Sequence, residues 1–286
     1  MGTLLTDAEA AILASPNANL WRPWVARVDA EELLETALGR SGAAAQGGEV
    51  VPAPAAARFR RLVARRVAGE PIALLRGGVE FRGLHLEVRK GTFAPRLSTE
   101  ALAGEAIRRL RRRPGPVAVD VATGVGPVAL AVGHEVPQAD VHGIDISKRA
   151  ITVARANARR LELANVAFHC GDGLGGLPRR LRGRIDVLTV HPPYVPQLEV
   201  RDLPREISVY EPRHTLTDGS IDGLGLVRTL ATDASEWLRR GGWLLVEVSP
   251  DRARSVRSIL RRAGLVDVRS LRPTLPVTRV VVGRTH

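Results

Sequence analysis

The stretch "VDVATGVGPVALA", residues 119–131, decides the fold. It begins as a valine-rich run that predicts a buried strand, turns at Gly124 and Gly126, and continues as a small-residue helix from Pro127. Glycines in such a turn let the backbone approach a ligand, and the helix N-terminus offers free N–H groups. Asp145, about 20 residues further on, ends the next predicted strand, where a carboxylate can bind ribose hydroxyls. The stretch therefore predicts a cofactor loop in an α/β sheet.

The loop alone does not select one cofactor. Its G-x-G-x-x-A order occurs in nicotinamide enzymes and in S-adenosylmethionine enzymes, and a glycine-rich turn can also be only a tight turn. Two acids favour S-adenosylmethionine: Asp120 lies on the strand before the glycines, and Asp172 ends the strand "VAFHCGD", where it can meet an adenine amino group. The next strand stops at His191-Pro192-Pro193-Tyr194, because two prolines cannot donate to a ladder. The position of this motif at the end of the following strand, where sites in such sheets form, decides in favour of S-adenosylmethionine.

Strands and helices alternate from residue 117 onward. Downstream of it the pattern predicts a helix, a strand, a helix capped by Ser147, two strands, a helix ending at Gly241-Gly242, a strand, a helix and two closing strands. Alternating units of this length predict a mostly parallel sheet covered by helices on both faces. The fold class that we expect is α/β, a Rossmann-like sheet of seven strands with an antiparallel C-terminal edge.

Three parts are expected along the chain. Residues 1–75 form a helical N-terminal domain, residues 76–98 a linking β-hairpin, and residues 99–286 the sheet domain. The hairpin is predicted from "VEFRGLHLEVRKGTFAP" (79–95), which alternates like two short strands. The sheet domain then opens with a helix that becomes basic toward its C-terminus, a charge order that suits the helix dipole.

The N-terminal domain is predicted from helical patterns that surround a loop. Residues 4–40 have a helical pattern, with Thr6 or Asp29 as N-cap and an end at Gly39. Residues 41–56 are rich in small residues and predict a loop that proteases would cut first. A further helix follows and stops before Pro71.

Composition excludes several classes of protein. The chain has 286 residues, of which 44% are hydrophobic, without the run of about 18 apolar residues that a membrane span needs. Its N-terminus carries early acids and no basic segment, which argues against a signal peptide. The lone cysteine, Cys170, cannot form an internal disulfide or a cysteine metal cluster, and no metal is expected. These features predict a cytoplasmic protein.

The net charge of +12 has two interpretations. Only Lys90 and Lys148 are lysines among the 42 basic residues, so the excess is almost entirely arginine, as a GC-rich genome produces on helix surfaces. The alternative is attraction to RNA, a ribosome or an acidic protein. The sequence contains no RNA-binding module with stacking aromatics, so charge predicts only weak, nonspecific nucleic-acid affinity. We expect no membrane partner and a monomer.

Several segments resemble the release factor glutamine methyltransferase family, also called HemK or PrmC. "GEPIALLRGGVEFRGLHLEVRKGTFAPRLSTEAL" (69–102) is similar to the family's linker hairpin and its PR-x-x-TE segment. Asp120 through Gly126 looks like its D-x-G-x-G-x-G loop, and His191 through Tyr194 aligns with its N-P-P-Y signature. "EPRHTLTDGSIDGLGLVRTL" (211–230) looks like its E-P-x-x-A-L…G-x-D-G-L segment. The motifs follow the family's order over nearly the whole chain.

The resemblance implies transfer of a methyl group from S-adenosylmethionine to the amide nitrogen of a glutamine in a protein such as a release factor, which the N-terminal domain contacts. Because the amide lone pair is delocalised, the site must orient the nitrogen. In the family loop an Asn oxygen and a proline carbonyl accept the two amide hydrogens. The acceptor pocket implied here consists of His191, Pro192, Pro193 and Tyr194. The residues implied around the cofactor are Asp120, Ala122, Thr123, Gly124, Val125, Gly126, Asp145, Asp172, Gly173 and His191, with Arg96, Thr99 and Glu100 closing over it.

The sequence departs from the family pattern at three places. His191 stands where the family has Asn, Ala122 replaces the first loop glycine, and Leu97-Ser98 replaces a Pro-plus-acid pair. Alanine is tolerable at 122 if its φ is negative. A neutral imidazole accepts one hydrogen bond or serves as a base, but it cannot copy the shape of a carboxamide.

Three hypotheses follow from the histidine. The protein can be a glutamine methyltransferase with a poorer amide clamp, a small-molecule N- or O-methyltransferase with His191 as base, or a catalytically weakened protein that binds the translation machinery through its basic surface. The substitution His191→Asn separates the first two, since it should increase amide methylation in one and abolish turnover in the other.

Overall fold

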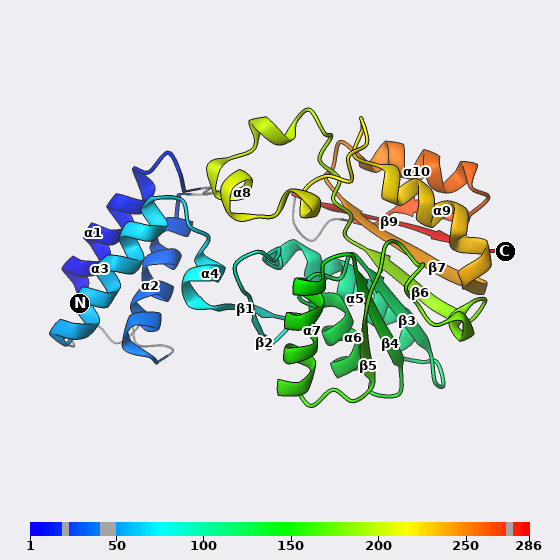
Figure 1. The fold of residues 1–286 in the computed structure, drawn as a ribbon, viewed down its shortest axis with the longest axis horizontal. Helices are drawn as coiled ribbons and strands as arrows, with labels where there is room; N and C mark the ends of the chain where they lie inside the picture. Colours follow the sequence, from blue (N-terminus) through cyan, green and yellow to red (C-terminus); the bar gives the residue numbers. More distant parts are fainter. Residues whose placement is uncertain (19–22, 41–49, 273–276) are drawn as a thin grey trace.

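The computed structural model describes residues 1–18, 23–40, 50–272 and 277–286. Figure 1 shows a helical body and an α/β body along the longest axis of the molecule, with the two chain termini at opposite ends. The α/β body contains a seven-stranded sheet in the order β5-β4-β3-β6-β7-β9-β8, which confirms the predicted fold class. The strands are β3 (Val117–Val121), β4 (Asp140–Asp145), β5 (Val166–Cys170), β6 (Ile185–Val190), β7 (Leu238–Val248), β8 (Val266–Ser270) and β9 (Arg279–Arg284).

Strand direction follows the predicted pattern. The pairs β3–β4, β3–β6, β4–β5 and β6–β7 are parallel, and β9 pairs antiparallel with both β7 and β8. Helices α5, α6 and α7 cover one face of the sheet, and α9 and α10 cover the other. Both faces are therefore buried, as the apolar runs of these strands require. The helices are α5 (Glu100–Leu110), α6 (Pro127–Glu135), α7 (Lys148–Arg160), α9 (Gly225–Trp237) and α10 (Ala253–Arg262).

The structure confirms one predicted boundary in this body and contradicts another. The Ser147 hydroxyl accepts the Ala150 N–H and caps α7 as expected. The end of α9 was predicted wrongly, because the helix stops at Trp237 and Gly241-Gly242 lie inside β7. Gly241 has a φ of 71°, and the ladder between β6 and β7 shifts register nearby. These glycines permit an irregularity in a strand rather than a helix cap.

The helical body is a small bundle with its own core. It consists of α1 (Gly2–Leu13), α2 (Val25–Leu38), α3 (Ala53–Val67) and α4 (Ile72–Arg76). Buried side chains such as Ile12, Leu33 and Phe59 form this core. Gly39 ends α2 in the left-handed conformation, as the sequence predicts. Of the loop expected at 41–56, residues 41–49 lie outside the described residues, and the rest was predicted too long because α3 begins at Ala53.

The two residues predicted as N-caps in the helical body, Thr6 and Asp29, do not cap a helix. Thr6 lies inside α1, and Asp29 lies inside α2 with only 3% of its surface exposed. The Asp29 carboxylate instead accepts a hydrogen bond of 2.6 Å from Nε of the buried Arg66. Nη1 of Arg66 donates at 2.9 Å to Glu206 on α8 (Arg205–Tyr210), which extends from the α/β body toward the bundle (Figure 1). One arginine therefore joins the two bodies.

A hairpin lies between the bundle and the sheet. Strands β1 (Gly78–Phe81) and β2 (Leu84–Glu87) pair antiparallel around a turn at Arg82-Gly83. The Arg82 N–H donates at 2.7 Å to the carboxylate of Glu100, the first residue of α5. Among the described residues, no helix is long and apolar enough to cross a membrane, and no group of His, Cys, Asp and Glu could hold a metal ion.

Candidate functional site

A cavity of about 310 Å³ opens at the carboxyl ends of β3, β4 and β6. The sheet topology explains its position, because β3 lies between its two parallel neighbours and all three strands end at the same edge. Thirteen of the sixteen residues implied for the site line it: Arg96, Thr99, Asp120, Ala122, Thr123, Gly124, Val125, Asp145, Asp172, Gly173, His191, Pro192 and Pro193.

Three residues of the predicted site do not line the cavity. Glu100 faces away and holds the hairpin turn through the Arg82 N–H. Gly126 has a φ of 91°, and a Cβ there would lie 2.7 Å from Cζ of Phe168, so its role is close packing. Tyr194 lies behind His191 and packs against the sheet core.

One wall of the cavity, the glycine-turn side, consists of residues 120–125 with Asp145, Asp172 and Gly173. The Asp145 carboxylate accepts the N–H of Gly124 and that of Ser147, each at 2.8 Å. A Cβ built on Gly124 or Gly173 would meet nothing within 4 Å, so both backbones border open space. This wall presents glycine backbone and carboxylates to a ligand.

Ala122 adopts a φ of 54°, so the negative φ that would make alanine harmless there is absent. The left-handed conformation costs an L-residue with a Cβ about 1–2 kcal/mol relative to the right-handed one. The glycine-turn side therefore retains the backbone shape that favours glycine while holding an alanine.

Asp120 is a buried carboxyl held by two hydroxyls. Thr123 Oγ1 donates to it at 2.6 Å and Thr189 Oγ1 at 2.7 Å, and 4% of the residue is exposed. Burial raises the pKa of Asp120 to about 7, against the lowering effect of the two hydroxyl hydrogen bonds. Its main contacts tie the end of β3 to the turn and to β6.

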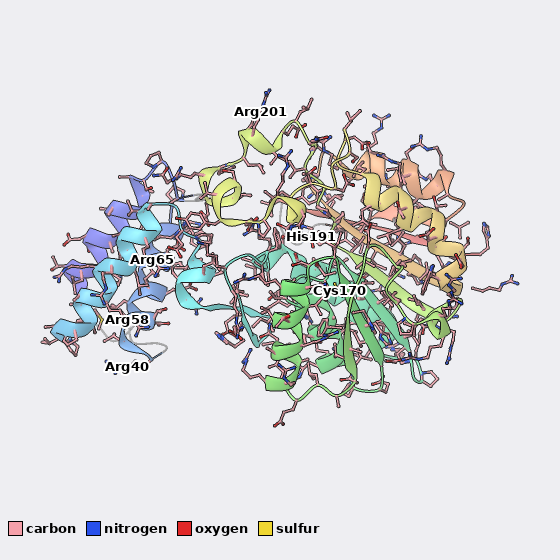
Figure 2. The ribbon with its side chains drawn as sticks, in the orientation of Figure 1. Arg40, Arg58, Arg65, Cys170, His191 and Arg201 are labelled. Carbon is pink, nitrogen blue, oxygen red and sulfur yellow. The ribbon has the colours of Figure 1, made fainter. Side chains whose placement is uncertain are left out.

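The other side of the cavity, the His191 side, consists of residues 191–193 with Phe93 and Thr99. Tyr194 and Glu247 do not line the cavity but lie against the His191 ring. His191 Nδ1 lies 3.2 Å from Oγ1 of Thr99 and 3.7 Å from Oε2 of Glu247. The ring stacks on Tyr194 with centroids 5.8 Å apart and meets the Phe93 ring edge-on at 5.7 Å. Figure 2 places His191 near the middle of the molecule, between the bundle and the sheet. The imidazole is therefore oriented by contacts on several sides.

Two acids on this side were missed from the sequence. Glu247 is completely buried near the end of β7, where Ser98 Oγ donates to its Oε1 at 3.1 Å. The signal was a single charge inside the apolar run "WLLVEVS". Glu211 is buried and forms an ion pair with Arg96, whose guanidinium lies 4.6 Å from the centroid of the Phe93 ring. Burial raises the pKa of Glu211.

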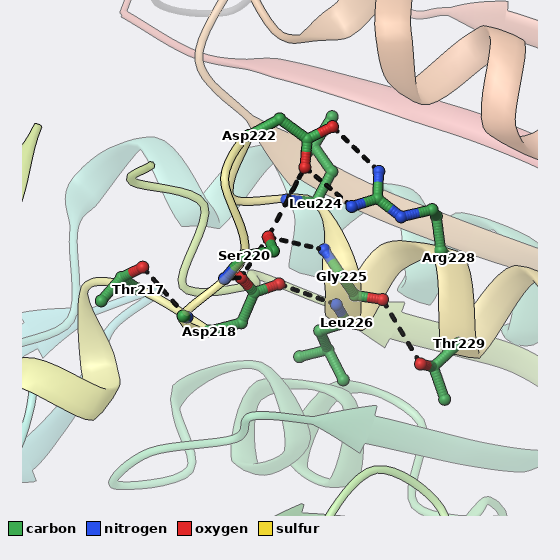
Figure 3. Close-up of polar contacts among 10 residues, drawn as sticks. Thr217, Asp218, Ser220, Asp222, Leu224, Gly225, Leu226, Arg228 and Thr229 are labelled. Atoms are coloured by element: carbon green, nitrogen blue, oxygen red, sulfur yellow. Dashed lines mark hydrogen bonds and ion pairs between the residues drawn. The ribbon is translucent and has the colours of Figure 1, made fainter. Parts of the chain in front are cut away.

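The segment after α8 forms part of the cavity lining and then caps α9. His214, Thr217 and Asp218 line the cavity, and sequence analysis had assigned them no role. Figure 3 shows the cap: the Asp218 carboxylate accepts the Leu226 N–H at 2.8 Å, and the Ser220 hydroxyl accepts the Gly225 N–H at 3.2 Å. These bonds satisfy free N–H groups of the first helical turn.

Asp222 completes this cap from the other side. Its two carboxylate oxygens accept hydrogen bonds from the Arg228 guanidinium at 2.7 and 2.9 Å (Figure 3). The paired arginine lowers the pKa of Asp222 to about 2. The motif "DGSIDGLG" is thus explained by the start of α9 and by the cavity wall that precedes it.

Comparisons with known proteins agree with this geometry. Residues 113–218 match the family model of a methyltransferase domain, and residues 25–77 match that of the PrmC N-terminal domain. The release factor glutamine methyltransferase of Bordetella pertussis is 38% identical, covering 91% of this chain and 96% of its own length. That of Geobacter sulfurreducens is 36% identical, covering 91% of this chain and 89% of its own.

The fold also matches a solved structure. A methyltransferase from Pyrococcus furiosus is 16% identical with a TM-score of 0.50, covering 71% of this chain and 89% of that chain, which is a likeness of fold. The alignments with these two relatives cover both bodies, and more than a third of the aligned residues are identical. The chain belongs to the release factor glutamine methyltransferase family.

Proposed function

We propose that this protein transfers a methyl group from S-adenosylmethionine to the side-chain amide nitrogen of a glutamine in a peptide chain release factor. The observation that carries this proposal is that the glycine-turn side and the His191 side open into one cavity. A cofactor on the first wall and an acceptor on the second would then meet. Membership of the family supports the acceptor class.

The residues of the glycine-turn side fit the cofactor. S-adenosylmethionine supplies an electrophilic methyl group on a positively charged sulfonium. Asp145 lies at the end of β4, where a carboxylate can accept hydrogen bonds from ribose hydroxyls. The open space at Gly124 and Gly173 leaves room for a ligand against the backbone, and Asp172 adds a carboxylate that can accept from an amino group.

The His191 side suits the binding of an amide. Because the nitrogen of a glutamine amide is a poor nucleophile, the protein must orient it rather than only bind it. The ring of His191 and the backbone carbonyl of the following proline are the acceptors that we assign to the two amide hydrogens. Tyr194 stacks on the ring, Thr99 lies 3.2 Å from its Nδ1, and Arg96 also lines the cavity.

We assign contact with the protein substrate to the helical domain, residues 1–75, connected through the hairpin at 76–98 to the sheet domain at 99–286. Support comes from the separate hydrophobic core of the bundle and from the match to the PrmC N-terminal domain. The cavity draws no lining residue from the described part of the bundle, so the bundle can bind a protein without competing with the cofactor.

The experiment that tests this proposal is methylation of a purified release factor with labelled S-adenosylmethionine, followed by mass-spectrometric mapping of the modified atom. A release factor with the mapped glutamine replaced by asparagine is the matched control. We expect label on one glutamine in the parent and none in the control. Label confined to small molecules from a lysate would favour a small-molecule methyltransferase instead. Calorimetry showing tight NAD binding without S-adenosylmethionine binding would contradict the cofactor.

A further inference from the structure

The two ring nitrogens of His191 have different surroundings. Nδ1 faces Oγ1 of Thr99 at 3.2 Å and Oε2 of Glu247 at 3.7 Å. No hydrogen bond of Nε2 occurs within the described residues, and His191 is part of the cavity wall. The protein therefore surrounds Nδ1 and leaves Nε2 to a ligand.

The surroundings of Nδ1 include a buried acid, Glu247. Its Oε1 already accepts from Ser98, whereas Oε2 is buried and makes no hydrogen bond among the described residues. A buried carboxylate oxygen without a donor is costly, and a carboxylate can only accept. An N–H on Nδ1 would place its partial positive charge 3.7 Å from Oε2, whereas a lone pair there would be repelled by the carboxylate. Thr99 can accept from the same N–H.

The ring cannot turn to exchange its two nitrogens without losing contacts. Tyr194 stacks on one face at an interplanar angle of 17°, and Phe93 meets the ring at 86°. Only 16% of the His191 side chain is exposed. The position of each nitrogen therefore follows from packing as well as from charge.

We propose that Glu247 is a positioning residue that holds His191 in the tautomer with the proton on Nδ1, so that Nε2 presents a hydrogen-bond acceptor to the cavity. A neutral imidazole accepts at one nitrogen only, so the tautomer determines whether the ring can replace an asparagine oxygen. The identity of the group received, an amide N–H, rests on the proposed function. The tautomer does not, because it is a property of the free protein.

The first test is nitrogen-15 NMR of the protein labelled at histidine, without cofactor or substrate. Comparison with His191→Asn identifies the His191 signals. We expect the neutral ring to carry its proton on Nδ1 in the parent and to become a mixture of tautomers in Glu247→Gln. A parent ring with its proton on Nε2 would overturn the proposal, and this measurement does not require any Glu247 variant to fold.

The second test is a double-mutant cycle on methylation of a purified release factor. Glu247→Gln should lower kcat about tenfold in the parent, because the tautomer with the proton on Nδ1 becomes a minority of the neutral rings and only that tautomer presents an acceptor at Nε2. The same substitution should change kcat by less than about twofold in the His191→Asn background, since an asparagine has no tautomer to fix. Equal effects in both backgrounds would mean that Glu247 acts on the fold alone.

Two controls separate the possible failures. Glu247→Asp retains the charge and should keep more activity than Glu247→Gln, and Glu105→Gln removes a largely buried carboxylate on α5 that does not line the cavity. If Glu247→Gln shifts the tautomer but no variant methylates a release factor, the proposed function fails and the role of Glu247 stands. If a release factor is methylated and the two substitutions have additive effects on kcat, the proposed function stands and the role of Glu247 fails.

Discussion

The two walls of the cavity are built in different ways. The glycine-turn side comes mainly from one continuous stretch, and its contacts are backbone N–H groups and carboxylates at strand ends, such as Gly124 with Asp145. The His191 side is assembled from segments far apart in the chain, with Phe93, Thr99 and Glu247 around one ring. Backbone conformation therefore fixes the first wall, and side-chain packing fixes the second. A substitution on the glycine-turn side should therefore affect folding more, and a substitution on the His191 side should affect the rate of methyl transfer more.

The largest effect that we expect tests the backbone constraint. Gly126→Ala places a Cβ 2.7 Å from Cζ of Phe168 at a φ of 91°, and it should lower the free energy of unfolding by about 2–4 kcal/mol. The control is Gly124→Ala, which shares the left-handed backbone with a φ of 57° but whose Cβ meets nothing within 4 Å, at a residue that lines the cavity. That variant should lose cofactor affinity more than stability. Urea unfolding measures the stability of each variant, and calorimetry measures its affinity for S-adenosylmethionine. Equal losses of stability in the two variants would show that the contact with Phe168 does not matter.

Asp120 makes the stability of the glycine-turn side depend on pH. Its pKa of about 7 in the folded protein exceeds the ordinary aspartate value of about 3.9, so between these values the folded state binds a proton that the unfolded state does not. Stability from this group is complete below about pH 4 and is lost as pH rises through 7. Relative to Asp120→Asn, the parent's free energy of unfolding should fall by about 2–3 kcal/mol between pH 5 and 8. Urea unfolding at several pH values measures this, and a constant difference would contradict it.

Asp145→Ala tests whether this wall holds the cofactor. The substitution removes the acceptor of two backbone N–H groups and of the proposed ribose contact, so S-adenosylmethionine affinity should fall by about 1–3 kcal/mol. Asp7→Ala, an exposed acid on α1, is the control for a lost negative charge. Calorimetry measures both affinities, and an unchanged affinity would show that Asp145 only orders the turn.

On the His191 side we expect a smaller change, confined to chemistry. His191→Asn restores a carboxamide acceptor and should increase kcat on a release factor about fivefold, or roughly 1 kcal/mol, with a smaller change in cofactor affinity. His169→Asn on β5, which does not line the cavity, is the matched control. Abolished turnover in His191→Asn would instead identify the ring as an essential base. Rates of methyl transfer at saturating cofactor distinguish an increased kcat from an abolished turnover.

The smallest effect concerns the departure at Ala122. Glycine relieves the left-handed strain by about 1 kcal/mol but adds freedom to the unfolded chain, so Ala122→Gly should change stability by less than about 0.5 kcal/mol. Glu162 has a φ of 56° and lies outside the cavity, so Glu162→Gly should change the stability measured by thermal unfolding as little as Ala122→Gly does. Only Ala122→Gly should also tighten S-adenosylmethionine. A gain in cofactor affinity at both positions would make the effect nonspecific.

The contrast between the walls explains how far sequence analysis could go. The sheet, the glycine turn and Asp145 follow from local periodicity and from the rule that parallel strands end at one edge. Glu247 was visible as a charge in an apolar strand, but its contact with His191 needs the packing of β7 beside β6. The positive φ of Ala122 could not be predicted either, because a residue type restricts φ without fixing it.

Arg66 has a consequence for how such proteins can be recombined. It is 2% exposed and bonded to Asp29 within the bundle and to Glu206 beyond it. A chimera that exchanged the bundle for that of a relative would leave Glu206 facing a new surface, and removal of one partner from a buried ion pair destabilises strongly. The three residues should therefore be exchanged together. Exchange should succeed only where the incoming bundle carries its own arginine to the same place.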